Sequence, residues 1–111
     1  MALHHPLSVL TGGAGTGKTT VLQVVHRVAE QVGVSVIQMA LSGRAAQRMR
    51  DATGRDASTI AAFLRAAEQG HFDPESEPLV IIDESSMLDL PLMYRILRAL
   101  PVRARLLLVG D

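Results

Sequence analysis

A glycine-rich segment at residues 12–19 limits the possible folds of this chain more than any other feature. It reads Gly-Gly-Ala-Gly-Thr-Gly-Lys-Thr and fits the phosphate-binding pattern G-x-x-x-x-G-K-[ST]. An aliphatic run precedes it and a helical pattern follows it, which is the context that such a loop requires. A plain turn between a strand and a helix needs one or two glycines, whereas this segment has four and contains the only lysine of the chain. The segment therefore predicts a loop that binds nucleotide phosphates.

The residue types in this loop have separate roles in phosphate binding. Glycines let main-chain N–H groups approach phosphate oxygens. A helix that starts near Gly17 directs its free N–H groups and the positive end of its dipole at the same anion. Lys18 is expected to place its ammonium group on the β- and γ-phosphates, and Thr19 to hold Mg²⁺ through its hydroxyl. The residues expected to bind ATP are Gly12, Gly13, Ala14, Gly15, Thr16, Gly17, Lys18, Thr19 and Thr20.

Short aliphatic runs alternate with helical patterns along the chain. The aliphatic runs span residues 7–11, 34–40, 79–83 and 105–110. Continuous apolar runs of this length suit a parallel sheet that is covered on both faces. Helical periodicity covers residues 18–32, 43–53, 59–68 and 91–100, and a solvated loop is expected at 70–78. This alternation predicts an α/β fold in one domain, with right-handed crossovers between parallel strands.

Two adjacent carboxylates, Asp83 and Glu84, follow the third aliphatic run. Ligands of parallel α/β sheets bind beyond the carboxyl ends of the strands, so the pair should share an edge with the phosphate loop. Asp83 is suited to Mg²⁺, directly or through a water. Glu84 is suited to orient and deprotonate the water that attacks the γ-phosphate. An acidic pair alone would more often be a helix cap or a solvated turn, but together with the loop it indicates a magnesium-nucleotide site.

A basic stretch follows the second aliphatic run and contains Arg44, Arg48, Arg50 and Arg55. Arg44 and Arg48 are spaced to share one helix face, which could contact a nucleic-acid backbone. On charge alone an ordinary solvated helix face explains the stretch better, because aspartates lie nearby. The whole chain has 11 basic and 11 acidic residues, which excludes a basic tail but allows a local basic face.

Several other classes of protein are excluded by composition. The chain has no cysteine, so disulfide scaffolds and thiolate zinc sites are excluded. No apolar run is long enough for a membrane span, and the first residues do not form a signal peptide. The histidines lack the spacing of metal ligands. We expect a soluble cytoplasmic chain without membrane contacts, whose core includes Phe63 and the methionines Met39, Met49, Met87 and Met93.

Five segments carry a resemblance to a known family. They are TGGAGTGKTT at residues 11–20, ALSGRAA at 40–46, STIAAFL at 58–64, IIDESSMLDL at 81–90 and LLVGD at 107–111. In order and spacing they resemble the first motor domain of RecD-like helicases of superfamily 1, and also the TraA and TraI type conjugative helicases. The stretch from Asp83 to Asp89 is the most diagnostic. Residues 1–111 therefore resemble a partial RecA-like ATP-binding motor domain.

This resemblance implies a P-loop parallel sheet with strand order 1-4-3-2 for the four expected strands. It also implies ATP hydrolysis that drives 5′→3′ movement on single-stranded DNA, in repair, recombination or conjugation, with other subunits of such a complex as further partners. Ser42, Gly43, Arg44 and Thr59 are then expected to line the DNA path. Many members of the family have a histidine where this chain has Ala61, so a DNA contact from that histidine is absent.

The resemblance further implies parts that these 111 residues do not contain. They are a glutamine that recognises adenine, a glutamine that senses the γ-phosphate, and a second motor domain with an arginine finger. We therefore expect the 111 residues alone to bind Mg·ATP weakly and to turn over negligibly. Two other interpretations remain: a P-loop kinase or NTPase acting on a small molecule, and a nucleotide-binding module without catalysis. The 70–78 loop is short and irregular for the lid of a kinase.

Overall fold

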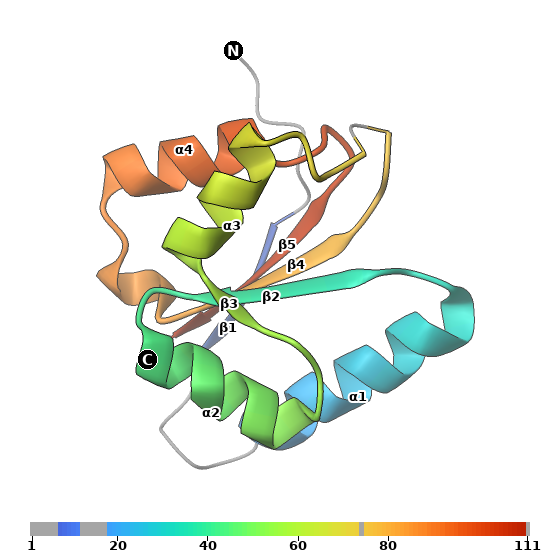
Figure 1. Ribbon diagram of the computed structural model, residues 1–111. Coiled ribbons are helices and arrows are strands. Elements are labelled where there is room, and N and C mark those ends of the chain that lie inside the picture. Colours follow the sequence, from blue (N-terminus) through green and yellow to red (C-terminus); the bar gives the residue numbers. More distant parts are fainter. Residues whose placement is uncertain (1–6, 12–17, 74, 111) are drawn as a thin grey trace.

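The computed structural model describes residues 7–11, 18–73 and 75–110. Its centre is a parallel five-stranded sheet with the order β1-β5-β4-β2-β3 (Figure 1). The strands are β1 (Leu7–Thr11), β2 (Val36–Ala40), β3 (Ser58–Thr59), β4 (Leu79–Asp83) and β5 (Arg105–Gly110).

Two layers of helices cover the sheet. Helices α1 and α2 lie against one face, and α3 and α4 lie against the other (Figure 1). A short 3-10 helix, η1, follows β4. The helices are α1 (Lys18–Val32), α2 (Gly43–Thr53), α3 (Ile60–Glu68), η1 (Ser85–Met87) and α4 (Leu90–Ala99). No helix among the described residues is long and apolar enough to cross a membrane.

The predicted fold class and strand order are confirmed. The four long strands are arranged as β1-β5-β4-β2, which is the predicted order 1-4-3-2. The two-residue strand β3, which extends the sheet beyond β2, was not predicted, because two residues are too few to show a period. The second strand starts at Val36 instead of residue 34, and the last helix starts at Leu90 because Asp89 caps it. The Asp89 side chain accepts a hydrogen bond from the N–H of Leu92 at 2.9 Å.

Aliphatic side chains form one core on each face of the sheet. Along β4, Val80 and Ile82 pack toward α3 and α4, whereas Ile81 packs toward α1 and α2. This alternation follows from the two-residue period of a strand. Each such buried side chain contributes roughly 1.5–3 kcal/mol to the free energy of unfolding. The predicted burial of Phe63, Met39 and Met49 is confirmed.

The predicted burial of Met87 is wrong. Its side chain is 66% exposed. Met87 ends the 3-10 helix that follows β4, and this turn lies beyond the strand end instead of in a helix layer. A methionine in sequence next to a buried strand was therefore not a sufficient sign of a core position.

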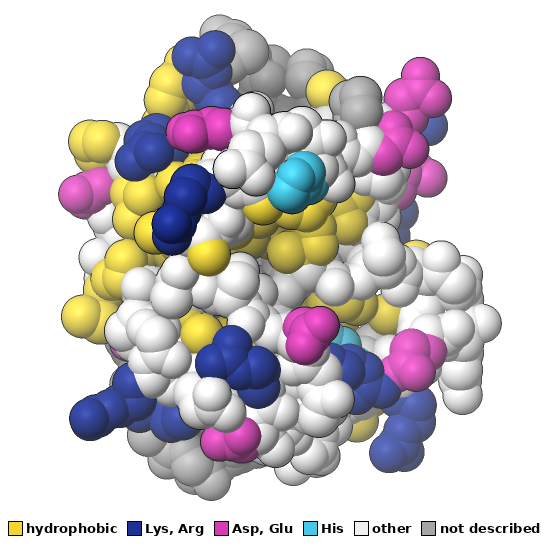
Figure 2. All heavy atoms as spheres, in the orientation of Figure 1, with side chains coloured by type: hydrophobic (Ala, Val, Ile, Leu, Met, Phe, Trp, Pro, Cys, Tyr) yellow, Lys and Arg dark blue, Asp and Glu magenta, His cyan; other side chains and the backbone are white. Residues whose placement is uncertain are grey.

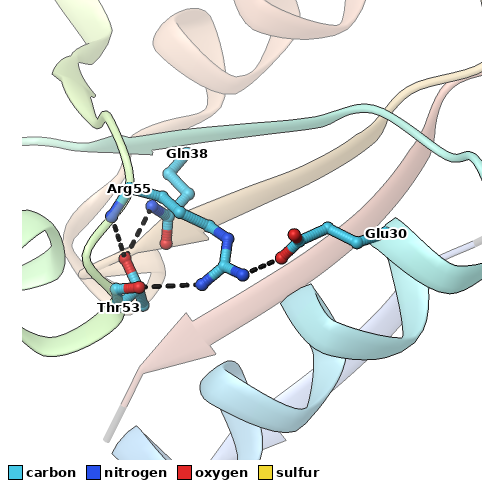
Figure 3. Close-up of polar contacts among 4 residues, drawn as sticks. All are labelled: Glu30, Gln38, Thr53 and Arg55. Atoms are coloured by element: carbon cyan, nitrogen blue, oxygen red, sulfur yellow. Dashed lines mark hydrogen bonds and ion pairs between the residues drawn. The ribbon is translucent and has the colours of Figure 1, made fainter.

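A polar network joins α1, β2 and the end of α2, with Gln38 and Thr53 buried and Arg55 and Glu30 nearer the surface (Figure 3). Gln38 on β2 is 3% exposed, and its Nε2 donates to the hydroxyl of Thr53 at 3.1 Å and to the carbonyl of Asp56 at 3.0 Å. The Arg55 guanidinium donates to the Thr53 carbonyl at 2.8 Å and forms an ion pair with Glu30 of α1. Hydrogen bonds to Thr53 and Asp56 compensate for the burial of the Gln38 Nε2 donor, so the network holds the segment after α2 in place.

Candidate functional site

The carboxyl ends of the strands meet along one edge of the sheet. In register, Thr11 of β1 lies beside Gly110 of β5, and Ala40 of β2 lies beside both Asp83 of β4 and Thr59 of β3. Since ligands of parallel α/β sheets bind at this edge, it is the candidate site. The residues predicted for nucleotide, metal and DNA binding belong to the segments after β1, β2 and β4 and to the last residues of β3 and β4.

The predicted phosphate loop connects β1 to α1, so the required strand–loop–helix context is present. Helix α1 begins at Lys18, and its first turn contains no acidic residue. Thr19 and Thr20 are exposed in that turn. Outside the described residues lie the side chain of Lys18 and the predicted ligands Gly12, Gly13, Ala14, Gly15, Thr16 and Gly17.

Asp83 is the last residue of β4 and is half-buried. It follows Ile81 by two residues and therefore lies on the sheet face that α1 covers. Its Oδ1 accepts a hydrogen bond from the N–H of Glu84 at 2.8 Å. Strand β5 separates β4 from β1, and α1 begins after the loop that follows β1. Carboxylate and hydroxyl oxygens are the ligands that Mg²⁺ prefers. Asp83 and Thr19 therefore have side chains suited to the predicted ion, and both belong to segments at the same edge of the sheet.

Glu84 has a left-handed backbone with φ 59° and ψ 31°. No other non-glycine residue that the structure describes has a positive φ. This conformation costs about 1–2 kcal/mol for a residue with a side chain. The carboxylate Oε1 accepts two hydrogen bonds from Ser42, one from its N–H at 3.0 Å and one from its hydroxyl at 3.1 Å. The predicted water-activating residue is therefore fixed to the end of β2. No local sequence pattern indicates this contact, because the two residues are 42 positions apart.

The predicted DNA contacts gather at two neighbouring helix N-termini. The Ser42 hydroxyl caps α2 by accepting a hydrogen bond from an N–H group of its first turn at 3.1 Å. The Thr59 hydroxyl caps α3 in the same way, also at 3.1 Å. Gly43 and Arg44 begin α2 and are exposed. Because β2 and β3 are adjacent strands, the structure brings Ser42, Gly43, Arg44 and Thr59 to one corner of the sheet.

The four arginines of the basic stretch divide into two pairs. Arg50 donates to the carbonyl of Ala57 and to the side chain of Gln47, and Arg55 belongs to the network around Thr53. Arg44 and Arg48 are exposed, and neither forms an ion pair or a side-chain hydrogen bond with the residues that the structure describes. In Figure 2 basic side chains are scattered among polar ones in the region of α1 and α2 and form no continuous patch. Two of the four arginines thus stabilise the fold.

Comparison with known proteins identifies the family. The sequence model described as an AAA domain matches residues 1–111. This chain belongs to the AAA domain family. That assignment covers every strand and helix of the structure, including the edge that holds the candidate site.

The AAA domain is similar to several curated helicases and transfer proteins. An ATP-dependent RecD2 DNA helicase from Deinococcus radiodurans is 46% identical in an alignment of 111 positions, which covers 96% of this chain and 16% of that protein. A RecBCD enzyme subunit RecD from Mycobacterium tuberculosis is 33% identical over 139 residues, covering 100% of this chain and 24% of that protein. A conjugal transfer protein TraA from Rhizobium radiobacter is 28% identical over 106 residues, which are 95% of this chain and 10% of that protein.

These relatives confirm the predicted resemblance to RecD-like and TraA helicases. The similarity extends over nearly the whole chain in all three comparisons. The chain spans a quarter or less of the length of each relative, namely 16%, 24% and 10%.

Proposed function

We propose that this AAA domain is the ATP-binding core of a motor domain in an ATP-dependent DNA helicase or translocase. The observation that carries the proposal is the position of β5 between β1 and β4. In this order the ends of β1 and β4 lie at one edge of the sheet; the predicted phosphate loop follows β1, and Glu84 follows Asp83 at the end of β4. A phosphate loop beside an acidic pair is the arrangement that nucleotide hydrolysis requires.

The proposed chemistry divides among four residues and the loop. Main-chain N–H groups of residues 12–20 cradle the phosphates, and Lys18 balances the charge on the β- and γ-phosphates. The Thr19 hydroxyl and the Asp83 carboxylate hold Mg²⁺, which when bound neutralises charge on the phosphate oxygens. Glu84 orients the attacking water and accepts its proton.

Single-stranded DNA is the proposed track, contacted through Ser42, Gly43, Arg44 and Thr59. Two observations support this part: the N-termini of α2 and α3 lie at one corner, and Arg44 is exposed there. Helix N-termini bind phosphate groups, and such backbone contacts do not depend on base sequence. The name of the RecD2 relative, a DNA helicase, supports DNA as the substrate, and the name of the RecD relative, a subunit of the RecBCD enzyme, supports partner subunits. The direction of movement, 5′→3′, follows from the family resemblance. A cytoplasmic location and a repair or conjugation complex complete the proposal.

Replacing Lys18 with alanine in the full-length protein tests the nucleotide site. We expect Lys18→Ala to lower DNA-stimulated ATPase by about 100-fold or more, because the charge on the phosphates loses its counter-ion. Phosphate release with and without single-stranded DNA measures the effect. Arg27→Ala, at an exposed position of the same helix, is the matched control and should keep the wild-type rate. An unchanged rate in Lys18→Ala would overturn the assignment.

A second measurement separates the helicase from the alternative enzyme class. Stimulation of ATPase by single-stranded DNA is compared with transfer of phosphate to a panel of small acceptors. We expect stimulation by DNA and release of inorganic phosphate only. Phosphorylation of an acceptor would favour the small-molecule kinase. The direction of movement is tested separately, by comparing the unwinding of duplexes that have a 5′ or a 3′ single-stranded tail.

A further inference from the structure

Helices α3 and α4 leave a groove between them on the sheet face opposite to α1 and α2 (Figure 1). One part of it is a hollow of about 240 Å³ near the start of both helices, and the other part is a hollow of about 530 Å³ toward their ends. Leu64, Glu68 and Arg95 line both hollows. The two hollows therefore form one groove that follows the contact between the helices.

The floor of the groove is apolar. Ile60 and Leu64 are buried in the core that α3 and α4 form against the sheet. The half-buried side chains of Leu41 and Leu92, together with Ala61, complete the apolar lining near the start of the helices. A hollow with this lining can accept aliphatic or aromatic side chains of a partner, because filling it removes apolar surface from water.

The rim of the groove is basic. Arg65 lies on the α3 side, and Arg95 and Arg98 lie on the α4 side. All three are exposed, and Arg65 and Arg95 form no ion pair or side-chain hydrogen bond with the residues that the structure describes. Among the described lining residues only Glu68 is acidic. Figure 2 shows basic side chains beside apolar surface in the region of α3 and α4, so the groove has an excess of positive charge.

This lining suits a protein segment better than a nucleic acid. Grooves for single-stranded nucleic acid combine basic side chains with aromatic rings on which bases stack. Tyr94 is the one aromatic residue among the described lining residues, and the Arg98 guanidinium already lies over its ring, 5.7 Å from the centroid. Glu68 would in addition repel phosphate groups. The apolar floor instead matches the anchor side chains of a peptide, and the arginines match carboxylates.

We propose that the groove between α3 and α4 binds an acidic segment of a partner protein that inserts apolar side chains into the two hollows. The carboxylates of this segment pair with Arg65, Arg95 and Arg98, because guanidinium groups bind carboxylates through two parallel hydrogen bonds. The buried apolar anchors supply most of the binding energy, and the charged rim sets the orientation and the choice of partner. The groove contains none of the residues that are proposed to bind nucleotide, metal or DNA.

Binding of synthetic peptides to the full-length protein tests the groove. The probe is a fluorescein-labelled peptide of about 12 residues that has leucines on one side of a helix and glutamates on the other. Two companion peptides have serines in place of the leucines or lysines in place of the glutamates. We expect fluorescence anisotropy to show binding of the first peptide only, because both the anchors and the charges are needed. Absence of binding by that peptide, or equal binding of either companion, would overturn the proposal.

Charge reversal at the rim shows where the peptide binds. Arg95 lines both hollows, so Arg95→Glu should weaken binding about 10-fold or more, because it places a carboxylate against the glutamates of the peptide. Arg65→Glu should act in the same way from the side of α3. Arg27→Glu, at an exposed position of α1 on the other sheet face, is the matched control and should keep the wild-type affinity. Urea denaturation checks that all three variants are folded, and equal peptide affinities of folded Arg95→Glu and the wild type would contradict the proposed site.

A labelled oligothymidine strand separates a peptide groove from a part of the DNA path. We expect Arg65→Glu and Arg95→Glu to keep the wild-type affinity for this strand within about 2-fold at physiological salt, where distant charges are screened. A loss of DNA affinity as large as the loss of peptide affinity would assign the groove to DNA and overturn the proposal. The effect of Lys18→Ala on ATPase depends on neither arginine, so the proposed function and this inference can fail separately.

Discussion

At the residue scale, the candidate site depends on the backbone conformation of Glu84 and on the absence of a side chain at Gly110. Glu84 adopts a left-handed conformation directly after β4. Gly110 at the end of β5 is needed for a different reason, because the Ser85 turn packs directly against its Cα position. Absence of a side chain at 110 allows the Ser85 hydroxyl to reach the carbonyl of Val109. The turn that presents Glu84 therefore depends on a small residue in the next strand.

Replacing Gly110 with alanine is expected to destabilise the protein. A Cβ atom would lie 3.3 Å from the main-chain N of Ser86, which cannot move aside as a flexible side chain can. Such overpacking costs typically 1–3 kcal/mol, so the free energy of unfolding in urea should fall by about that amount. Gly43→Ala is the control, because no atom lies within 4 Å of its Cβ position. Equal effects of the two substitutions would contradict this explanation.

At the element scale, α2 connects two regions of the molecule. Its N-terminus lies at the candidate site, where Ser42 caps it. Its C-terminus ends at Thr53, next to Gln38 and Arg55 (Figure 3). Along the helix, Arg44 and Arg48 stay exposed while Arg50 donates to a carbonyl beyond the helix end. One element thus combines a candidate DNA contact with a structural role.

Thr53→Val tests the buried end of α2. Valine has the shape of threonine but leaves the buried Nε2 of Gln38 without its side-chain acceptor, so unfolding free energy should fall by about 1–3 kcal/mol. Thr53→Ser keeps the hydroxyl and should retain more of the stability.

Arg55→Ala removes an ion pair whose side chains are 37% and 62% exposed, and we expect this pair to account for a loss of less than about 1 kcal/mol of unfolding free energy. Urea denaturation of the three variants provides the comparison. A smaller effect for Thr53→Val than for Thr53→Ser would contradict the role of the hydroxyl.

At the scale of the whole molecule, the AAA domain places its candidate nucleotide and DNA surfaces on one edge of a sheet with helices on both faces. The phosphate loop follows β1, an outer strand of the described sheet, and the proposed DNA corner lies at β2 and β3 toward the other side. Strands β5 and β4 lie between them, and the Glu84–Ser42 contact spans from β4 to β2. The two surfaces are therefore connected through the strand ends.

The 111 residues by themselves are expected to bind Mg·ATP weakly and to turn it over negligibly. Related phosphoryl-transfer systems gain several orders of magnitude in rate, about 10³–10⁵, from an arginine supplied by another domain or protein. Isothermal titration measures the binding, and a phosphate-release assay measures the turnover. Robust turnover by this chain alone would show that its own residues complete the site.

Most of the fold could be predicted because its elements have strong local signals. Periodicity predicts α1 and α2 with the same bounds that the structure shows. The order of the four long strands came from the family resemblance, since apolar runs alone do not specify neighbours. The strand β3, the helix η1 and the exposed Met87 were missed, because elements of two or three residues carry no period.

The candidate site was predictable in its residue types and only partly in its geometry. A glycine-rich loop, an acidic pair and aliphatic runs are local patterns, and local patterns were sufficient to predict an α/β nucleotide-binding domain. The bond from Ser42 to Glu84 and the network from Gln38 to Glu30 arise from residues far apart in the chain. A hydrogen bond needs its two atoms within about 3 Å, and only the parallel pairing of β2 with β4 brings residues 42 positions apart to that distance.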